Sequence, residues 1–190
     1  RGENVSFTVH GLRVREFPIL LVRGTSSLAD SGERNLSRRA AQRFSRWLTD
    51  LGIPHGAIDD EGVKRGGLKG ARVAVLCYNA QPDAEELRSL KTFLNAGGKL
   101  VVCYSASDRL AKLMDVRLGP LVTSEEPGQW ASMSFDKARA KHFPGLVYDV
   151  AWNLLLAGPG SESSTSIATW NTARGASADR VACVRSRNGF

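Results

Sequence analysis

The sequence predicts an α/β protein with a three-layer, doubly wound and mostly parallel sheet, followed by antiparallel strands in the C-terminal third. Two observations carry this prediction. Over the first 120 residues, apolar strand-like runs alternate with amphipathic helical segments, a pattern typical of βαβ units with right-handed crossovers. Beyond Pro120 the helical periodicity ends, and short strand-like runs follow one another between glycine, serine and proline residues.

The composition is that of a globular protein. Of the 190 residues, 42% are hydrophobic and 24% are charged, which argues against a disordered chain. No apolar run approaches the roughly 20 residues that span a bilayer, so we expect no membrane partner. The net charge of +7 favours anionic partners in general without indicating one of them.

The ends of the sequence suggest a piece of a longer polypeptide. The chain begins with Arg1 rather than methionine and stops at Phe190 within a strand-like run. We expect residues 1–16, which contain the whole alternating run ENVSFTVHGLRV with His10, to be a strand or linker from a preceding domain. Residues 17–190 are expected to form the main domain, truncated at its C-terminal end.

The first strand and the first helix of this domain are predicted from neighbouring segments of the sequence. FPILLVRG is a continuous apolar run, as expected of a central strand covered on both faces. The next helix ends at Gly52, and its predicted core face consists of Leu36, Ala40, Phe44, Trp47, Leu48 and Leu51. Five arginines fall on the opposite side, which we interpret as a solvated face: Arg34, Arg38, Arg39, Arg43 and Arg46.

An acidic triplet, Asp59, Asp60 and Glu61, follows a short segment around His55. Its carboxylates are hard ligands suited to a cation, but their spacing is not that of an EF-hand, so we predict a solvated loop. The glycines of the following KRGGLKG match neither a dinucleotide fingerprint nor a phosphate-binding loop. The sequence therefore predicts no cofactor and no metal.

Two further strand and helix pairs complete the α/β part. RVAVLCYNA and KLVVCYS are predicted as buried strands. Between them a helix begins after Asp83, which with Glu86 forms an Asp version of the capping box, and ends at Gly97. Its predicted core face is Leu87, Leu90, Phe93 and Leu94. The segment SDRLAKLMDVRLG is predicted as a short helix whose inward side chains are Leu110, Leu113 and Met114.

The C-terminal third is predicted to hold antiparallel strands at WASMSF, GLVYDVAW, SIATW and VACVRSR, with GPGSESSTS as a flexible connection. Trp130, Trp152 and Trp170 lie in this part. An exposed tryptophan can stack on a sugar ring, which would make carbohydrate a partner. We interpret all three as core residues, because aromatic burial strongly favours folding.

These segments together resemble the class I glutamine amidotransferase-like fold, a flavodoxin-like α/β architecture. The similar pattern is a strand, a helix that begins after Pro82 and Asp83 and ends at AGGKLVV, a turn, and a short helix closing at DVRLG. With its tail of IATWNTARG and VACVRSRNGF, the chain resembles non-catalytic domains of large carbohydrate-active proteins. Examples are the trimerisation domain of family 42 beta-galactosidases and domains of family 10 glycosyl hydrolase-like proteins. The likeness covers residues 17–190 and implies a fold rather than an activity.

Active members of this fold carry a cysteine nucleophile at a tight turn flanked by glycines. In KLVVCYSAS the resemblance places Tyr104 at the nucleophile position, with Cys103 one residue earlier and on the other face of the strand. No glycine flanks either residue, and His142 lacks the acidic residue two positions on that active members carry. Ser105 with Asp108 and His142 is a weaker serine arrangement. The sequence assigns no catalytic residue and leaves Cys103, Tyr104, Ser105 and His142 as weak candidates.

The three cysteines, Cys77, Cys103 and Cys183, lack the paired spacings of zinc or redox sites. Each lies in an apolar run, and we interpret all three as buried free thiols that pack as small hydrophobic residues. They give no indication of the cellular compartment.

These observations favour a non-catalytic domain with an assembly or binding role in a larger, carbohydrate-processing protein, a context that would fit a secreted or periplasmic location. The expected partners are neighbouring domains of the same polypeptide, a second copy of the chain, and carbohydrate. One alternative is a thiol-dependent hydrolase or amidotransferase that uses Cys103 with His142. Another is a nucleic-acid-binding module through the helix from Arg34 to Arg46, which the lack of interleaved aromatic residues disfavours.

Overall fold

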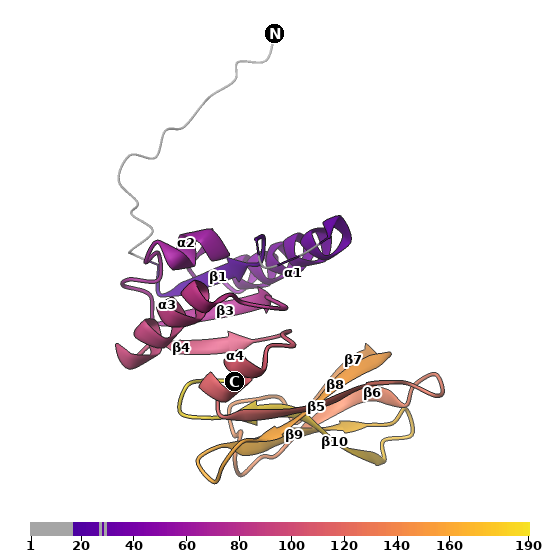
Figure 1. The fold of residues 1–190 in the computed structure, drawn as a ribbon. Coiled ribbons are helices and arrows are strands. Elements are labelled where there is room, and N and C mark those ends of the chain that lie inside the picture. The colour runs from indigo at the N-terminus through magenta and orange to yellow at the C-terminus, as the bar shows by residue number, and fades with distance from the viewer. Residues whose placement is uncertain (1–16, 27, 29) are drawn as a thin grey trace.

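A computed structural model describes residues 17–26, 28 and 30–190 of the chain. It contains a parallel sheet with its helices and, beyond the β4 edge of that sheet, a group of antiparallel strands (Figure 1). The predicted α/β class, with parallel strands first and antiparallel strands after them, is confirmed. The strand or linker expected at residues 1–16 lies outside the described residues.

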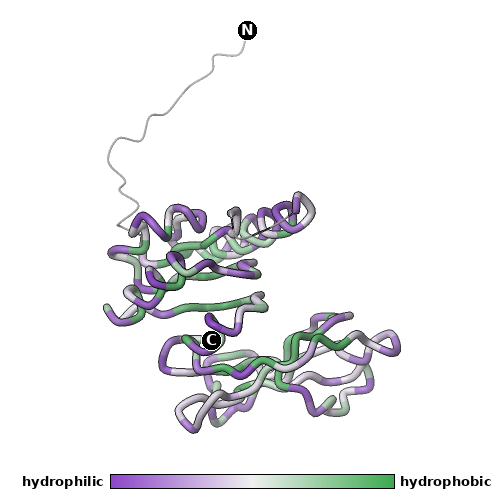
Figure 2. Tube along the Cα trace, viewed as in Figure 1, coloured by the Kyte–Doolittle hydropathy of each residue, from purple (hydrophilic) through white to green (hydrophobic). Residues whose placement is uncertain are grey.

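The parallel sheet has four strands in the order β2-β1-β3-β4. These are β1 (Ile19–Arg23), β2 (His55–Asp59), β3 (Val73–Tyr78) and β4 (Lys99–Val102). The inner strands β1 and β3 are apolar apart from Arg23 at the end of β1, as expected of strands covered on both faces, and Figure 2 shows this hydrophobic centre. Both strands lie where the continuous apolar runs predicted them.

Helices cover the two faces of this sheet. On one face α1 (Ser31–Asp50) packs Ala41 and Phe44 against Leu21 and Val75. The opposite face is covered by α2 (Asp60–Lys64), α3 (Ala84–Asn95) and α4 (Asp108–Leu113). The buried apolar core on that side includes Leu20, Val22, Val63, Leu90, Phe93, Leu100, Leu110 and Met114. The core faces predicted for α3 and α4 are confirmed.

The predicted core face of α1 is partly wrong. Leu36, Trp47 and Leu51 are exposed, and the most buried positions are instead Ser37 and Ala41. The helix therefore meets the sheet along a narrow stripe in which small residues allow close approach, and the wider apolar face extends beyond the sheet. Arg34, Arg38, Arg39, Arg43 and Arg46 lie on the outer side of the helix, as predicted.

The antiparallel strands form a four-stranded sheet of order β10-β9-β6-β7 and a two-stranded sheet of β5 and β8. The four predicted strands are β6 (Trp130–Phe135), β7 (Leu146–Ala151), β9 (Thr165–Asn171) and β10 (Ser177–Arg185). Trp130 and Trp170 are buried here as predicted, whereas Trp152, directly after β7, is 56% exposed.

The sequence patterns did not predict β5 (Val116–Thr123) and β8 (Asn153–Pro159). The helix predicted over SDRLAKLMDVRLG is wrong for residues 116–119, which begin β5, because α4 ends at Leu113. Gly119 and Pro120 interrupt the strand pattern of β5, and the pairing of β5 with β8 shifts register between Leu118 and Leu121. The segment predicted as a flexible connection is held in a turn, because the hydroxyls of Ser161 and Ser163 donate to Asp115 Oδ2 at 2.7 and 2.8 Å.

The last residues of the chain return to the parallel sheet and lie beside β4. Leu100 N–H donates to the Asn188 carbonyl at 2.8 Å, and Val102 N–H donates to the Phe190 carbonyl at 2.9 Å. Gly189 has a φ of +132° and lies so close to the Leu100 backbone that a Cβ would stand 1.8 Å from its carbonyl oxygen. Only glycine fits this position, which joins the antiparallel part to the parallel sheet.

Candidate ligand-binding site

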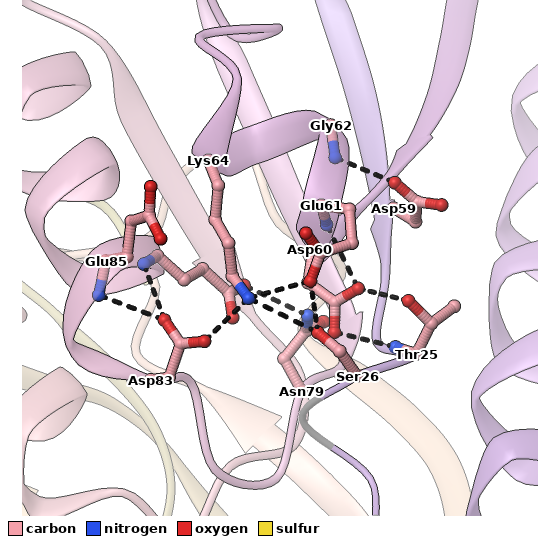
Figure 3. Close-up of polar contacts among 11 residues, drawn as sticks. Thr25, Ser26, Asp59, Asp60, Glu61, Gly62, Lys64, Asn79, Asp83 and Glu85 are labelled. Carbon is pink, nitrogen blue, oxygen red and sulfur yellow. Dashed lines mark hydrogen bonds and ion pairs between the residues drawn. The ribbon is translucent and has the colours of Figure 1, made fainter.

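The carboxyl ends of the parallel strands form the candidate site. The chain order reverses between β1 and β3, and in such sheets ligands bind in the crevice outside the carboxyl ends of the strands at that point. Polar side chains gather there from three connections, as Figure 3 shows. Thr25 and Ser26 follow β1, Asp60 and Lys64 follow β2, and Asn79 follows β3.

Asp60 is fully buried and holds the β1 and β2 ends together. Its carboxylate accepts the Thr25 N–H at 2.8 Å, the Thr25 hydroxyl, and the Glu61 N–H at 3.1 Å. Asp59 caps α2 by accepting the Gly62 N–H at 2.8 Å. The prediction of a solvated acidic loop is therefore wrong for Asp59 and Asp60, because backbone N–H groups and the Thr25 hydroxyl donate hydrogen bonds to their carboxylates.

Lys64 links α2 to the start of α3. Its Nζ lies 2.6 Å from Asp83 Oδ2 and 2.8 Å from Glu61 Oε1, and it donates to the Ser26 hydroxyl at 3.4 Å. The hydrogen bonds to Asp83 and Glu61 raise the pKa of the Lys64 ammonium. The hydrogen bond from Lys64 likewise lowers the pKa of Glu61. At neutral pH this part of the edge is an ionised network satisfied by its own residues.

Asp83 caps α3 as predicted, but the predicted capping box is wrong. Asp83 Oδ1 accepts the N–H groups of Glu85 at 3.0 Å and Glu86 at 2.9 Å. The Glu86 side chain turns inward and becomes fully buried, rather than reaching back to the cap. The hydrogen bond from Glu86 N–H, followed by Lys64, lowers the pKa of Asp83.

Glu86 and Asn79 form a buried polar pair behind this network. Asn79 Nδ2 donates to Glu86 Oε1 at 3.4 Å. Among the described residues, Glu86 Oε2 and Asn79 Oδ1 have no hydrogen-bond partner. Burial, with the neighbouring charges of Asp60 and Asp83, raises the pKa of Glu86 to about 7. Glu86 is thus a buried carboxyl that changes its charge near neutral pH.

The predicted candidates Cys103, Tyr104 and Ser105 lie at the same edge, directly after β4. Cys103 is exposed, Cys183 is half-buried and only Cys77 is buried, so the prediction of three buried thiols is wrong for two of them. Because β4 ends at Val102, Cys103 lies outside the strand. The protein atoms packed around its sulfur nevertheless raise the pKa of the Cys103 thiol to about 11.

The other candidates have contacts of a structural kind. The Tyr104 ring stacks on the Tyr78 ring with centroids 4.4 Å apart, and the Ser105 hydroxyl donates to the Ala80 carbonyl at 3.2 Å. His142 is exposed in the turn between β6 and β7. Within the described ranges, no hydrogen bond joins His142 to Cys103 or Ser105.

The cluster of Asp60, Lys64, Asn79, Asp83 and Glu86 was not predicted from the sequence. Its members lie up to 26 residues apart, and each has an ordinary local explanation as a loop, helix-surface or capping residue. A usable signal was nevertheless present, because a polar residue directly after a buried parallel strand lies at the carboxyl edge, where such residues meet.

The part of the chain that the structure describes contains no group of histidine, cysteine or acidic residues arranged to hold a metal ion. In the same part, no helix has the length and apolar character needed to cross a membrane.

A solved structure shares this fold. A ThuA-like protein from Bacteroides uniformis aligns with a TM-score of 0.60 and 13% identity, over 90% of this chain and 72% of that one. A GMP synthase component from Thermoplasma acidophilum gives a TM-score of 0.47 and 14% identity, over 82% and 74% of the two chains. No protein-family model and no curated protein sequence matches the chain. The first likeness shows the fold.

Proposed function

We propose that this chain is a non-catalytic amidotransferase-like domain that serves assembly or binding in a larger, carbohydrate-processing protein. The packing of α1 on one face of the sheet and of α2, α3 and α4 on the other supports a three-layer, flavodoxin-like arrangement. The finer resemblance to the domains of family 42 and family 10 proteins rests on the sequence motifs and belongs to this proposal.

The turn after β4 supports a domain without thiol chemistry. A cysteine nucleophile needs a depressed pKa and a base within hydrogen-bond reach. Cys103 has a raised pKa, and no imidazole partner is found for it in the described residues. The competing function, a hydrolase or amidotransferase, is favoured only by the exposure of Cys103 at the ligand-binding edge.

An apolar row on the edge strand β7 is the observation that carries the assembly role. Leu146, Tyr148 and Val150 alternate along β7 and are 43%, 82% and 60% exposed, and Trp152 continues the row. Among the described strands, β7 is the outer one of its sheet, and none of them pairs with the backbone groups of its second edge, beside this row. Exposed apolar patches on such an edge mark interaction surfaces.

The occupant that we propose for this edge is a second copy of the chain. Two β7 strands paired antiparallel about a two-fold axis would satisfy each other's backbone groups and bring the two apolar rows together. A charged residue in the middle of the row would leave this interface with an uncompensated desolvated charge.

Tyr148→Lys is therefore expected to shift the protein towards the monomer, with at least a roughly tenfold weaker association constant by sedimentation equilibrium. Asp149→Lys on the other face of β7 is the control. It makes the same strand more positive than Tyr148→Lys does, but outside the row, and should associate as the wild type does. A wild-type chain that is monomeric at every concentration would contradict the proposed self-assembly.

A further inference from the structure

A groove beside the carboxyl end of β1 is lined by arginines and hydroxyl groups. It has a volume of about 570 Å³ and lies between the end of β1 and the first turns of α1. Its lining residues are Arg23, Thr25, Ser31, Arg34, Asn35 and Arg38. We call this the arginine groove. It adjoins the candidate site, because Thr25 is the residue that donates to buried Asp60.

The arginine groove brings together three positive charges from two elements. Arg23 is the last residue of β1, and Arg34 and Arg38 are one turn apart on the same face of α1. In the described part of the chain, neither Arg23 nor Arg38 forms an ion pair with a carboxylate. Two acidic residues lie beside lining residues of the groove: Asp59 is the register partner of Arg23 on β2, and buried Asp60 accepts the Thr25 N–H. Asp30 caps α1 by accepting the Glu33 N–H at 2.8 Å.

The local contacts hold two of the guanidinium groups. Arg38 Nη2 donates to Asn35 Oδ1 at 2.8 Å, and Arg34 Nη1 donates to the Leu28 carbonyl at 3.2 Å. A guanidinium carries five donors, so the bond to Asn35 orients Arg38 and leaves donors for a ligand. The groove opens at the N-terminal end of a 20-residue helix, whose dipole adds to the attraction of an anion there.

We propose that the arginine groove binds the phosphate group of a small phosphorylated molecule. Guanidinium groups bind tetrahedral oxyanions through paired N–H donors, and the hydroxyl of Ser31 adds a further donor to the lining. The groove is large enough for a phosphate with one attached ring, since small-molecule pockets measure about 300–1,000 Å³. This inference rests on the proposed binding role and names the class of ligand for it.

Isothermal titration calorimetry of the full chain tests the inference with three probes: glucose 6-phosphate, inorganic phosphate and glucose. We expect binding of the two phosphates and none of glucose. Tighter binding of glucose 6-phosphate would make a phosphate monoester the ligand, whereas equal binding of both would make it free phosphate. The substitution Arg38→Gln is expected to weaken phosphate binding at least roughly tenfold, and Arg23→Gln similarly.

Arg43→Gln is the matched control, because Arg43 is an exposed arginine of the same helix outside the arginine groove. It removes the same charge and should change the affinity less than about twofold. Equal losses in Arg38→Gln and Arg43→Gln would overturn the inference and show diffuse attraction of anions, as would preference for a single-stranded oligonucleotide over both phosphates. Binding of glucose alone would also overturn it. None of these results depends on Cys103 or β7. A failure of the arginine groove to bind phosphate can therefore be distinguished from a failure of the proposed non-catalytic assembly role.

Discussion

Glu86→Gln is expected to make the protein more stable above pH 7 and to remove much of the pH dependence of its stability. Burial raises the pKa of Glu86 from its ordinary 4.5 to about 7, so the folded state binds this proton more tightly than the unfolded state. The free energy of unfolding of the wild type should therefore fall as the pH rises from 4.5 to 7, by about 2–3 kcal/mol. Glutamine keeps the shape and stays neutral, so the variant should retain that stability at pH 8.

The measurement is urea unfolding of both proteins at pH values from 4 to 8. Glu85→Gln is the matched control, since Glu85 is the exposed neighbour of Glu86 in the same helical turn, and its unfolding free energy should stay within about 0.5 kcal/mol of the wild type. A Glu86→Gln protein that loses stability between pH 5 and 7 as steeply as the wild type would contradict the buried, proton-binding role of Glu86.

Gly189→Ala is expected to detach the C-terminal residues from β4 and to lower the unfolding free energy by more than about 2 kcal/mol. The added Cβ would stand 1.8 Å from the Leu100 carbonyl oxygen, a contact that only a shift of the backbone can relieve. The amide protons of Leu100 and Val102, which bond to Asn188 and Phe190, should then lose protection against hydrogen exchange.

Gly175→Ala is the control that separates the effect of this clash on stability from the effect of placing a side chain at a positive φ. Gly175 also has a positive φ, +79°, but nothing lies within 4 Å of the position of its Cβ. Its substitution should cost only about 1 kcal/mol and leave the exchange of Leu100 and Val102 unchanged. Equal destabilisation by the two substitutions would show that the close approach at Gly189 does not hold the C-terminal residues to the sheet.

The elements predicted most accurately from the sequence are strands buried on both faces and helices whose buried residues repeat at helical spacing. β1 and β3 were found because both of their faces are covered, and α3 because its core face repeats at helical spacing between clear caps. The face of α1 was predicted too wide, because an apolar stripe does not reveal where the sheet beneath it ends. β5 was missed because Gly119 and Pro120 interrupt its strand pattern. Its partner, β8, also lies far along the chain, so no local pattern indicates the pairing.

The candidate site was less accessible to sequence reasoning for a physical reason. The burial of Asp60 depends on donors from Thr25, 35 residues earlier in the chain, and the pKa of Glu86 depends on the closeness of Asp60 and Asp83. No local pattern encodes these distances. The exposure of Cys103 likewise follows from the end of β4 at Val102, one residue earlier than the apolar run suggests.

The pH dependence of the alkylation rate of Cys103, followed by mass spectrometry of the native protein, tests most directly the claim that this domain is not a thiol enzyme. We predict that exposed Cys103 is alkylated with an apparent pKa well above the roughly 8.5 of a free thiol, and that His142→Ala leaves its rate unchanged. Rapid alkylation at neutral pH with an apparent pKa below about 7, slowed by His142→Ala, would contradict the account and establish an activated nucleophile.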